Sequence, residues 1–200
     1  MNGFRRISGG VVLVVYLLQP ILTGALEGQL PSSSEQHQII LELRYGFPPA
    51  LEDPRKNEEL ILLIEEKYPG EIAGYPATIK AYYGSLLGLR AKHAFFPNRK
   101  LKYLMESLRL LDEAVKQDDA ELETYFLRFS SLHHMPSLLS IPTKRREDIA
   151  RILELIEDES FKSMEPDFRR DVIDFMLQSR RLTEAQTAEL ELLKKQLNGN

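Results

Sequence analysis

Apolar residues recur three and four positions apart in every segment of the chain after residue 38, between turns that contain proline. This spacing places apolar side chains on one face of an α-helix, and no segment shows the strict alternation of a half-buried strand. We therefore predict an all-α fold of about seven or eight helices, arranged as antiparallel helical hairpins. The hairpins build either an α-solenoid or an irregular helical bundle.

Capping residues predict where the individual helices begin and end. Side chains of Ser, Thr, Asp and Asn accept hydrogen bonds from the first backbone N–H groups of a helix. We expect N-caps at Ser33 or Ser34, Asp53, Asn98, Asp118 or Asp119, Thr143 and Thr183 (with Gln186 in a capping box), a helix start at Pro166, and a helix end at Phe47-Pro48-Pro49. In the helix that follows Asn98, Leu101 and Met105 should face the core. The last helix, over 183–198, could pack against its own chain or against another.

One segment, 76–95, carries small residues on one face of its helix. A glycine inside a helix costs about 0.5–1 kcal/mol relative to alanine, so two on one line indicate a close neighbour. We expect a second helix to pack against this stripe. The stripe consists of Ala77, Ala81, Gly84, Gly88 and Ala91.

Parts of the chain resemble known helical proteins. The run Ser107-x3-Leu111-x2-Ala114 is similar to the second helix of a tetratricopeptide (TPR) unit, and the helix over 77–95 resembles a first TPR helix. The spacing between these two helices differs from that of a regular repeat, so the resemblance implies a TPR-like fold. Residues 80–150 also resemble a set of uncharacterised exported bacterial helical proteins. That likeness rests on Ala81-Tyr82-Tyr83-Gly84, Ala91-Lys92-His93, Phe96-Pro97, Lys100, Leu111-Asp112-Glu113-Ala114-Val115, Phe126-Leu127-Arg128 and Pro136.

The N-terminus has the three parts of a secretory signal peptide. Arg5 and Arg6 precede an apolar stretch over 11–22, and Thr23-Gly24-Ala25 supplies small residues before a cleavage site. We predict a signal peptide over 1–25, a linker over 26–34 and a single α-helical domain over 35–200. The apolar stretch of about 12 residues is short of the roughly 20 that a membrane-spanning helix needs. We therefore expect a periplasmic or secreted protein; the alternative is an inner-membrane anchor through residues 7–25.

Charge is segregated along the sequence. The 200 residues carry a net charge of −4, which argues against a nucleic-acid partner. Nevertheless no Asp or Glu occurs from Ile72 to Met105, and seven acids follow from Glu106 to Glu123. We predict a basic and aromatic face that binds a protein or an acidic peptide, with an anionic membrane or envelope component as a further peripheral contact. Its predicted residues are Tyr82, Tyr83, Arg90, Lys92, Phe96, Arg99, Lys100, Lys102 and Arg128. Arg128 either forms a structural bridge to Asp112 or Glu113 across the hairpin or projects into a groove as a ligand contact.

The residue types offer little for catalysis or metal binding. There is no Cys, hence no disulfide, thiolate zinc site or cysteine nucleophile, and an exported chain without disulfides suits a bacterial periplasm. The four His form neither an HExxH motif nor a His-x3-His pair. We expect no cofactor, no metal and no enzymatic activity, but a protein-interaction or scaffold module. The alternatives are a helical periplasmic enzyme of unknown reaction and a membrane-anchored structural protein.

Overall fold

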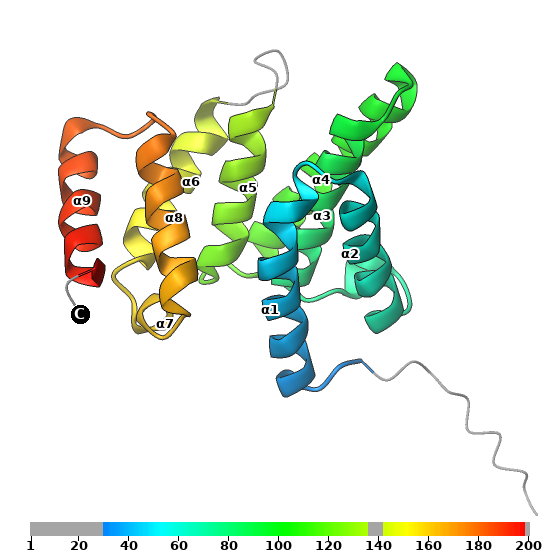
Figure 1. Cartoon of the computed structure of the whole chain (residues 1–200), viewed down its shortest axis with the longest axis horizontal. Coiled ribbons are helices and arrows are strands. Elements are labelled where there is room, and N and C mark those ends of the chain that lie inside the picture. Colours follow the sequence, from blue (N-terminus) through cyan, green and yellow to red (C-terminus); the bar gives the residue numbers. More distant parts are fainter. Residues whose placement is uncertain (1–29, 136–141, 199–200) are drawn as a thin grey trace, which may run out of the picture.

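The computed structural model describes residues 30–135 and 142–198, and within these ranges the chain forms helices and no strand. The predicted all-α class is confirmed. Successive long helices run in opposite directions, and α1 lies between the α3–α4 hairpin and α5 (Figure 1). The helices are α1 (Ser33–Ala50), α2 (Pro54–Lys67), the short 3-10 helix η1 (Ile72–Gly74), α3 (Ala77–His93), α4 (Pro97–Gln117), α5 (Leu122–His134), α6 (Pro142–Leu155), α7 (Glu159–Lys162), α8 (Pro166–Gln178) and α9 (Glu184–Asn198).

The predicted signal peptide over 1–25 lies outside the described residues, as do residues 26–29 of the linker and Pro136. Within the described part of the chain, no helix combines the length and the apolar character that a membrane span needs.

The helix starts agree with the predicted caps in part. Asp53 caps α2 by accepting a hydrogen bond from the Arg55 N–H at 2.8 Å. The capping box of Thr183 and Gln186 is present before α9. The other predicted caps are wrong: Ser32 caps α1 in a box with Glu35, Phe96 precedes α4, Glu121 caps α5, and Thr143 lies inside α6. A local pattern permits several neighbouring caps, and packing of the helix selects one of them.

The predicted end of α1 at Phe47-Pro48-Pro49 is also wrong, because the helix continues through both prolines to Ala50. Proline lacks a backbone N–H, but in the last turn of a helix this removes only hydrogen bonds next to the helix end, so the loss is small. Core packing holds this turn in place. The Phe47 ring packs edge-on against Tyr82 with centroids 6.0 Å apart, and Ala50 is fully buried.

The small-residue face of α3 lies against α4, as predicted. A Cβ on Gly84 would be 3.2 Å from the Ser107 carbonyl oxygen, and one on Gly88 would be 3.1 Å from the Ser107 hydroxyl. The two helices form a hairpin whose turn projects beyond the neighbouring helices (Figure 1). For this reason Leu101 and Met105, which we expected in the core, are 53% and 56% exposed.

The buried apolar residues form two clusters. The first joins α1, α2, α3 and α4, and the second joins α5, α6, α7, α8 and α9. Leu127 of α5 belongs to the first cluster and Phe129 to the second, so α5 connects them. Leu190 of α9 is 1% exposed in the second cluster, and the last helix therefore packs on its own chain.

Candidate functional site

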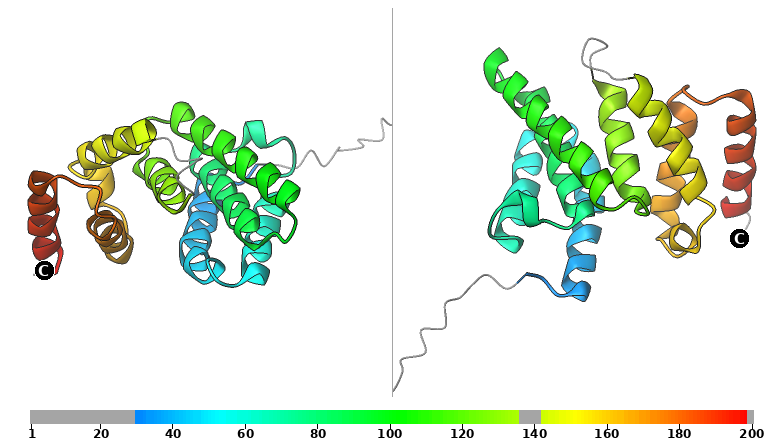
Figure 2. Two further views of the ribbon diagram at one scale, coloured as in Figure 1. Left: turned by 90° about the horizontal axis from the view of Figure 1, so that it is seen from above. Right: turned by 180° about the vertical axis from the view of Figure 1, so that it is seen from behind.

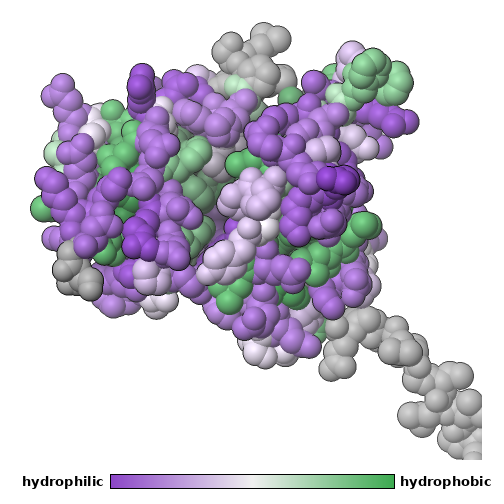
Figure 3. Space-filling model, in the orientation of Figure 1, coloured by the Kyte–Doolittle hydropathy of each residue, from purple (hydrophilic) through white to green (hydrophobic). Residues whose placement is uncertain are grey.

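A groove of about 640 Å³ lies where the two clusters meet. Helices α1, α3, α5 and α8 line it, and residues of α4 close one end. Seen from above, α5 is set back between α1 and α8 (Figure 2), and the surface is hollowed between those two helices (Figure 3). The lining is mainly apolar, and its larger side chains include Phe47, Leu89, Leu104, Phe126, Leu127 and Phe175.

Helical periodicity explains how each helix presents its lining residues. On α5 the lining positions are 126, 127, 130, 131 and 134, which form one face over about two turns. On α8, Phe168, Asp171 and Phe175 follow at spacings of three and four. The face on α5 includes Ser130 and Ser131, whose small side chains keep the middle of the groove open.

Arg44 of α1 fixes the groove at one end by bonding to both sides of it. Its guanidinium donates to the Glu123 carboxylate at 2.8 and 2.7 Å and also bonds to Glu165 before α8. Tyr82 donates its hydroxyl to the same Glu123 carboxylate at 2.5 Å. Burial, together with the Glu123 charge, raises the pKa of Tyr82 well above its ordinary value, so Tyr82 stays a neutral donor. The Arg44 guanidinium also lies 4.3 Å from the Phe168 ring centroid.

Arg128 joins the two clusters behind the groove. It donates to Asp148 of α6 at 2.6 Å and to Asp112 of α4 at 3.0 Å, and Lys144 also bonds to Asp112. Asp148 is fully buried, and this burial raises its pKa to about 6, although the hydrogen bonds from Arg128 act in the opposite direction. Arg128 is 7% exposed. It is therefore the structural bridge to Asp112, and not a residue of an exposed face.

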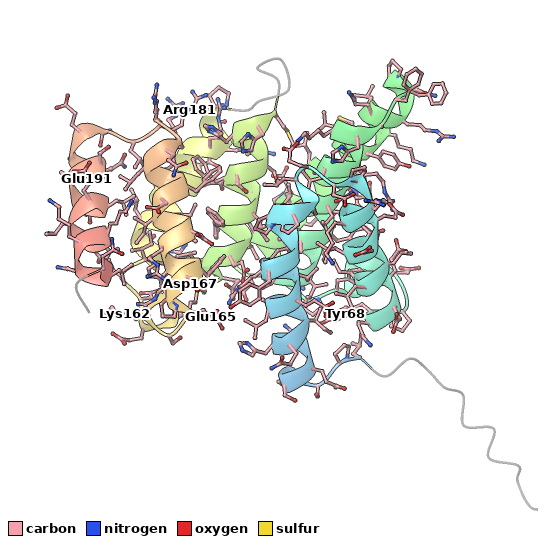
Figure 4. All side chains as sticks on the ribbon, viewed as in Figure 1. Tyr68, Lys162, Glu165, Asp167, Arg181 and Glu191 are labelled. Carbon is pink, nitrogen blue, oxygen red and sulfur yellow. The ribbon has the colours of Figure 1, made fainter. Side chains whose placement is uncertain are left out.

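Basic groups gather at the other end of the groove. The C-terminal ends of α1, α3, α5 and α8 all lie there (Figure 1), and helix C-termini favour nearby cations. Lys92 donates to the Leu51 carbonyl at 2.7 Å and to the Glu52 carboxylate at 2.9 Å. Lys100 is exposed and has no ion pair within the described residues. Figure 4 shows Glu165 and Arg181 at opposite ends of α8, and Glu165 is bonded to Arg44 at the first end of the groove.

The structure divides the nine predicted face residues among four places. Tyr82, Lys92 and Lys100 line the groove. Tyr83 and Arg90 face α2, where Tyr83 donates to Glu65 at 2.7 Å and Arg90 donates to Glu58 at 2.5 Å. Phe96, Arg99 and Lys102 lie at the exposed turn between α3 and α4, and Arg128 lies at the buried bridge. Tyr82, Tyr83 and Arg128 are buried, which corrects the expectation that all nine share one surface.

Sequence reasoning missed the groove residues that come from distant segments. Arg44 and Glu123 are 79 positions apart, and Arg44 and Glu165 are 121 apart. No local spacing relates such residues. The sequence offers one weak signal, because Glu123 stands three positions before Phe126 and four before Leu127, at helical spacing from apolar residues.

Comparison with known protein families, with curated proteins and with solved structures gives no match. Among residues 30–135 and 142–198, no three His, Asp or Glu side chains are grouped as a metal site. The candidate site is therefore defined by the structure alone. It is an apolar groove in an all-α protein, with Lys92 and Lys100 at one end.

Proposed function

We propose that this chain is a protein-interaction module whose groove binds the apolar face of an amphipathic peptide segment. The observation that carries the proposal is the apolar groove of about 640 Å³ between α1, α3, α5 and α8. Its size falls in the range of about 300–1,000 Å³ typical of ligand sites. Amphipathic helices bind in such grooves through apolar anchors at helical spacing.

Charge at the groove ends supports an acidic segment in a defined orientation. Lys100 at one mouth has no acidic partner in the described part of the chain, and Lys92 is half-exposed beside it. At the opposite end Arg44 is already bound by Glu123 and Glu165. An acidic residue of the partner would therefore lie beside Lys100, and its apolar residues would follow the groove toward Phe168.

A binding role also suits the titratable groups of the groove better than catalysis does. Arg44 and Lys92 are engaged in structural hydrogen bonds, and the groove-lining Asp171 is exposed on α8. We propose an exported, TPR-like scaffold protein of the periplasm or the cell exterior, in line with the predicted signal peptide over 1–25. Mass spectrometry of the N-terminus of the protein in its host tests export: a chain that begins near Leu26 supports it, and an intact N-terminus supports the membrane anchor.

A displayed peptide library tests the groove. Peptides are selected on the wild-type protein and then compared on Ser130→Trp, which fills the middle of the groove, and on Ser34→Trp, an exposed position of α1 outside it. We expect enriched peptides with apolar residues at i, i+3 or i+4 and i+7 and an acidic end. They should bind Ser34→Trp like wild type and fail to bind Ser130→Trp. Peptides that bind both variants equally would refute the groove as the site.

Lys100→Glu adds a test of orientation. The selected peptides should bind this variant roughly ten-fold more weakly, because the reversal places like charges at the mouth. Lys195→Glu makes the same change on α9, far from the groove, and should leave the affinity unchanged. An equal loss in both variants would show that only the net charge of the protein matters.

A further inference from the structure

Exposed apolar side chains are concentrated at the turn between α3 and α4. Eight large apolar side chains are exposed in the described part of the chain, and four of them fall within residues 95–105. Phe95 is 90% exposed and Phe96 is 53% exposed, and their rings pack edge-on against each other at 5.3 Å. Leu101 and Met105 continue this surface along the first turns of α4. Such a concentration on a surface indicates an interaction site.

Three cations surround these apolar side chains. Arg99, Lys100 and Lys102 are exposed, and none has an ion pair with a described residue. Half of the other exposed bases among the described residues are paired, as Lys67 is with Glu66. The Arg99 guanidinium lies 5.6 Å from the Phe96 ring centroid, so apolar and cationic groups share one small surface. No acid lies within 72–105 to weaken the positive field.

The shape of this region favours a flat partner. The end of the α3–α4 hairpin projects from the body of the protein (Figure 1), and Figure 3 shows hydrophobic residues at its extremity. A protein partner would need a matching cavity for two protruding phenyl rings. A lipid bilayer needs no such cavity, because aromatic rings can insert into its headgroup region while Lys and Arg side chains reach the phosphates.

We propose that the hairpin tip, defined as Phe95, Phe96, Arg99, Leu101, Lys102 and Met105, docks on the surface of an anionic lipid bilayer. The phenyl rings enter the interface, and Arg99 and Lys102 bind lipid phosphates. None of these six residues lines the groove, so a protein held by its tip could still bind a peptide along α1, α5 and α8.

The absence of tryptophan from the chain permits a local test on the full-length protein. Phe95→Trp places a single fluorophore at the tip. Tyr45→Trp, at a position of α1 that is 65% exposed, is the matched control. Both are titrated with vesicles of phosphatidylcholine alone and of phosphatidylcholine mixed with phosphatidylglycerol. For the Phe95→Trp variant we expect a blue shift of the tryptophan emission with the mixed vesicles alone, quenching by brominated acyl chains, and reversal by salt.

Charge variants in the Phe95→Trp background complete the test. Each base near an anionic surface strengthens binding roughly five-fold, so Arg99→Glu/Lys102→Glu should weaken it by at least about 25-fold. Lys116→Glu/Lys195→Glu changes the net charge equally at distant exposed sites and should have little effect. Because Arg99 and Lys102 do not line the groove, the first pair should leave peptide binding intact, so the two proposals fail separately.

Three results would overturn the proposal. The first is no blue shift of the Phe95→Trp variant with the mixed vesicles. The second is an equal shift for the Tyr45→Trp variant, which would mean that the whole chain adsorbs. In the third, polyglutamate binds with the same dependence on Arg99 and Lys102 while lipid gives no shift, which would assign the tip to an acidic protein.

Discussion

Replacing Arg44 with Met should sharply destabilise the junction between the two apolar clusters. Arg44 donates two hydrogen bonds to Glu123 and one to Glu165, and these contacts join α1 to α5 and to the start of α8. The Glu123 side chain is 1% exposed and that of Arg44 is 12% exposed. The methionine leaves Glu123 buried with the Tyr82 hydroxyl as its remaining side-chain partner.

The expected loss follows from the unpaired carboxylate rather than from the contact itself. Removing one partner of a buried ion pair costs about 3–5 kcal/mol, since the other charge stays in a poorly solvated place. With an m-value of about 2 kcal/mol/M, a loss of about 4 kcal/mol lowers the urea midpoint by roughly 2 M. Adding Glu123→Gln to this variant removes the unpaired carboxylate charge, and the glutamine side-chain oxygen can still accept the hydrogen bond from Tyr82. The double variant Arg44→Met/Glu123→Gln should therefore be more stable than Arg44→Met alone, by about 1 kcal/mol or more.

Urea unfolding followed by circular dichroism at pH 7 measures all four members of this cycle. Lys56→Met is the control, because Lys56 forms an exposed pair with Glu59 on α2 and should cost at most about 0.5 kcal/mol. A loss below about 1 kcal/mol for Arg44→Met would refute the reasoning. So would a double variant whose loss equals the sum of the two single losses.

Two further predictions concern stability. The pKa of Asp148 is about 6 in the folded protein, above its ordinary value of about 3.9. Between these pH values the folded state binds a proton that the unfolded state has lost. The free energy of unfolding should therefore fall by roughly 3 kcal/mol as pH rises through this window. Asp148→Asn should flatten that slope in urea titrations from pH 4 to 7, and an unchanged slope would assign it to other groups. Gly88→Ala removes a helical glycine against the movable Ser107 hydroxyl, whereas Gly84→Ala meets the Ser107 backbone carbonyl. Thermal unfolding should therefore show Gly88→Ala as the more stable variant by about 1 kcal/mol, and the reverse order would contradict this packing.

The sequence was informative where a structural requirement is local. Apolar spacing predicted the helical class, Asp53 with Pro54 predicted the start of α2, and the glycines at 84 and 88 predicted a close neighbour for α3. Helix ends were less certain, because α1 continues through Pro48 once Ala50 is buried. In that case tertiary packing outweighs the local preference of proline for a helix end.

The site depends on which helices become neighbours, and here local patterns fail. Basic residues close in sequence were expected to share a surface, yet Arg90 turns toward α2 and Lys92 toward the groove. Residues two positions apart on a helix point about 200° from each other, so the separation follows once the neighbours of α3 are known. Glu123 illustrates the same limit: its partners Arg44 and Tyr82 lie on α1 and α3, and only the three-dimensional fold brings them together.

The ion pairs at the junction also bear on the proposed function. The groove walls come from both apolar clusters, so the groove width depends on how one cluster sits against the other. Apolar contacts allow one cluster to slide against the other, whereas the directional hydrogen bonds of Arg44 and Arg128 fix their relative position. A peptide that touches α1 and α8 together adds contacts across the same junction. Peptide binding and junction stability are then linked. The closed junction strengthens peptide binding by the same free energy with which the bound peptide stabilises the closed junction, so a substitution that loosens the junction should weaken peptide binding.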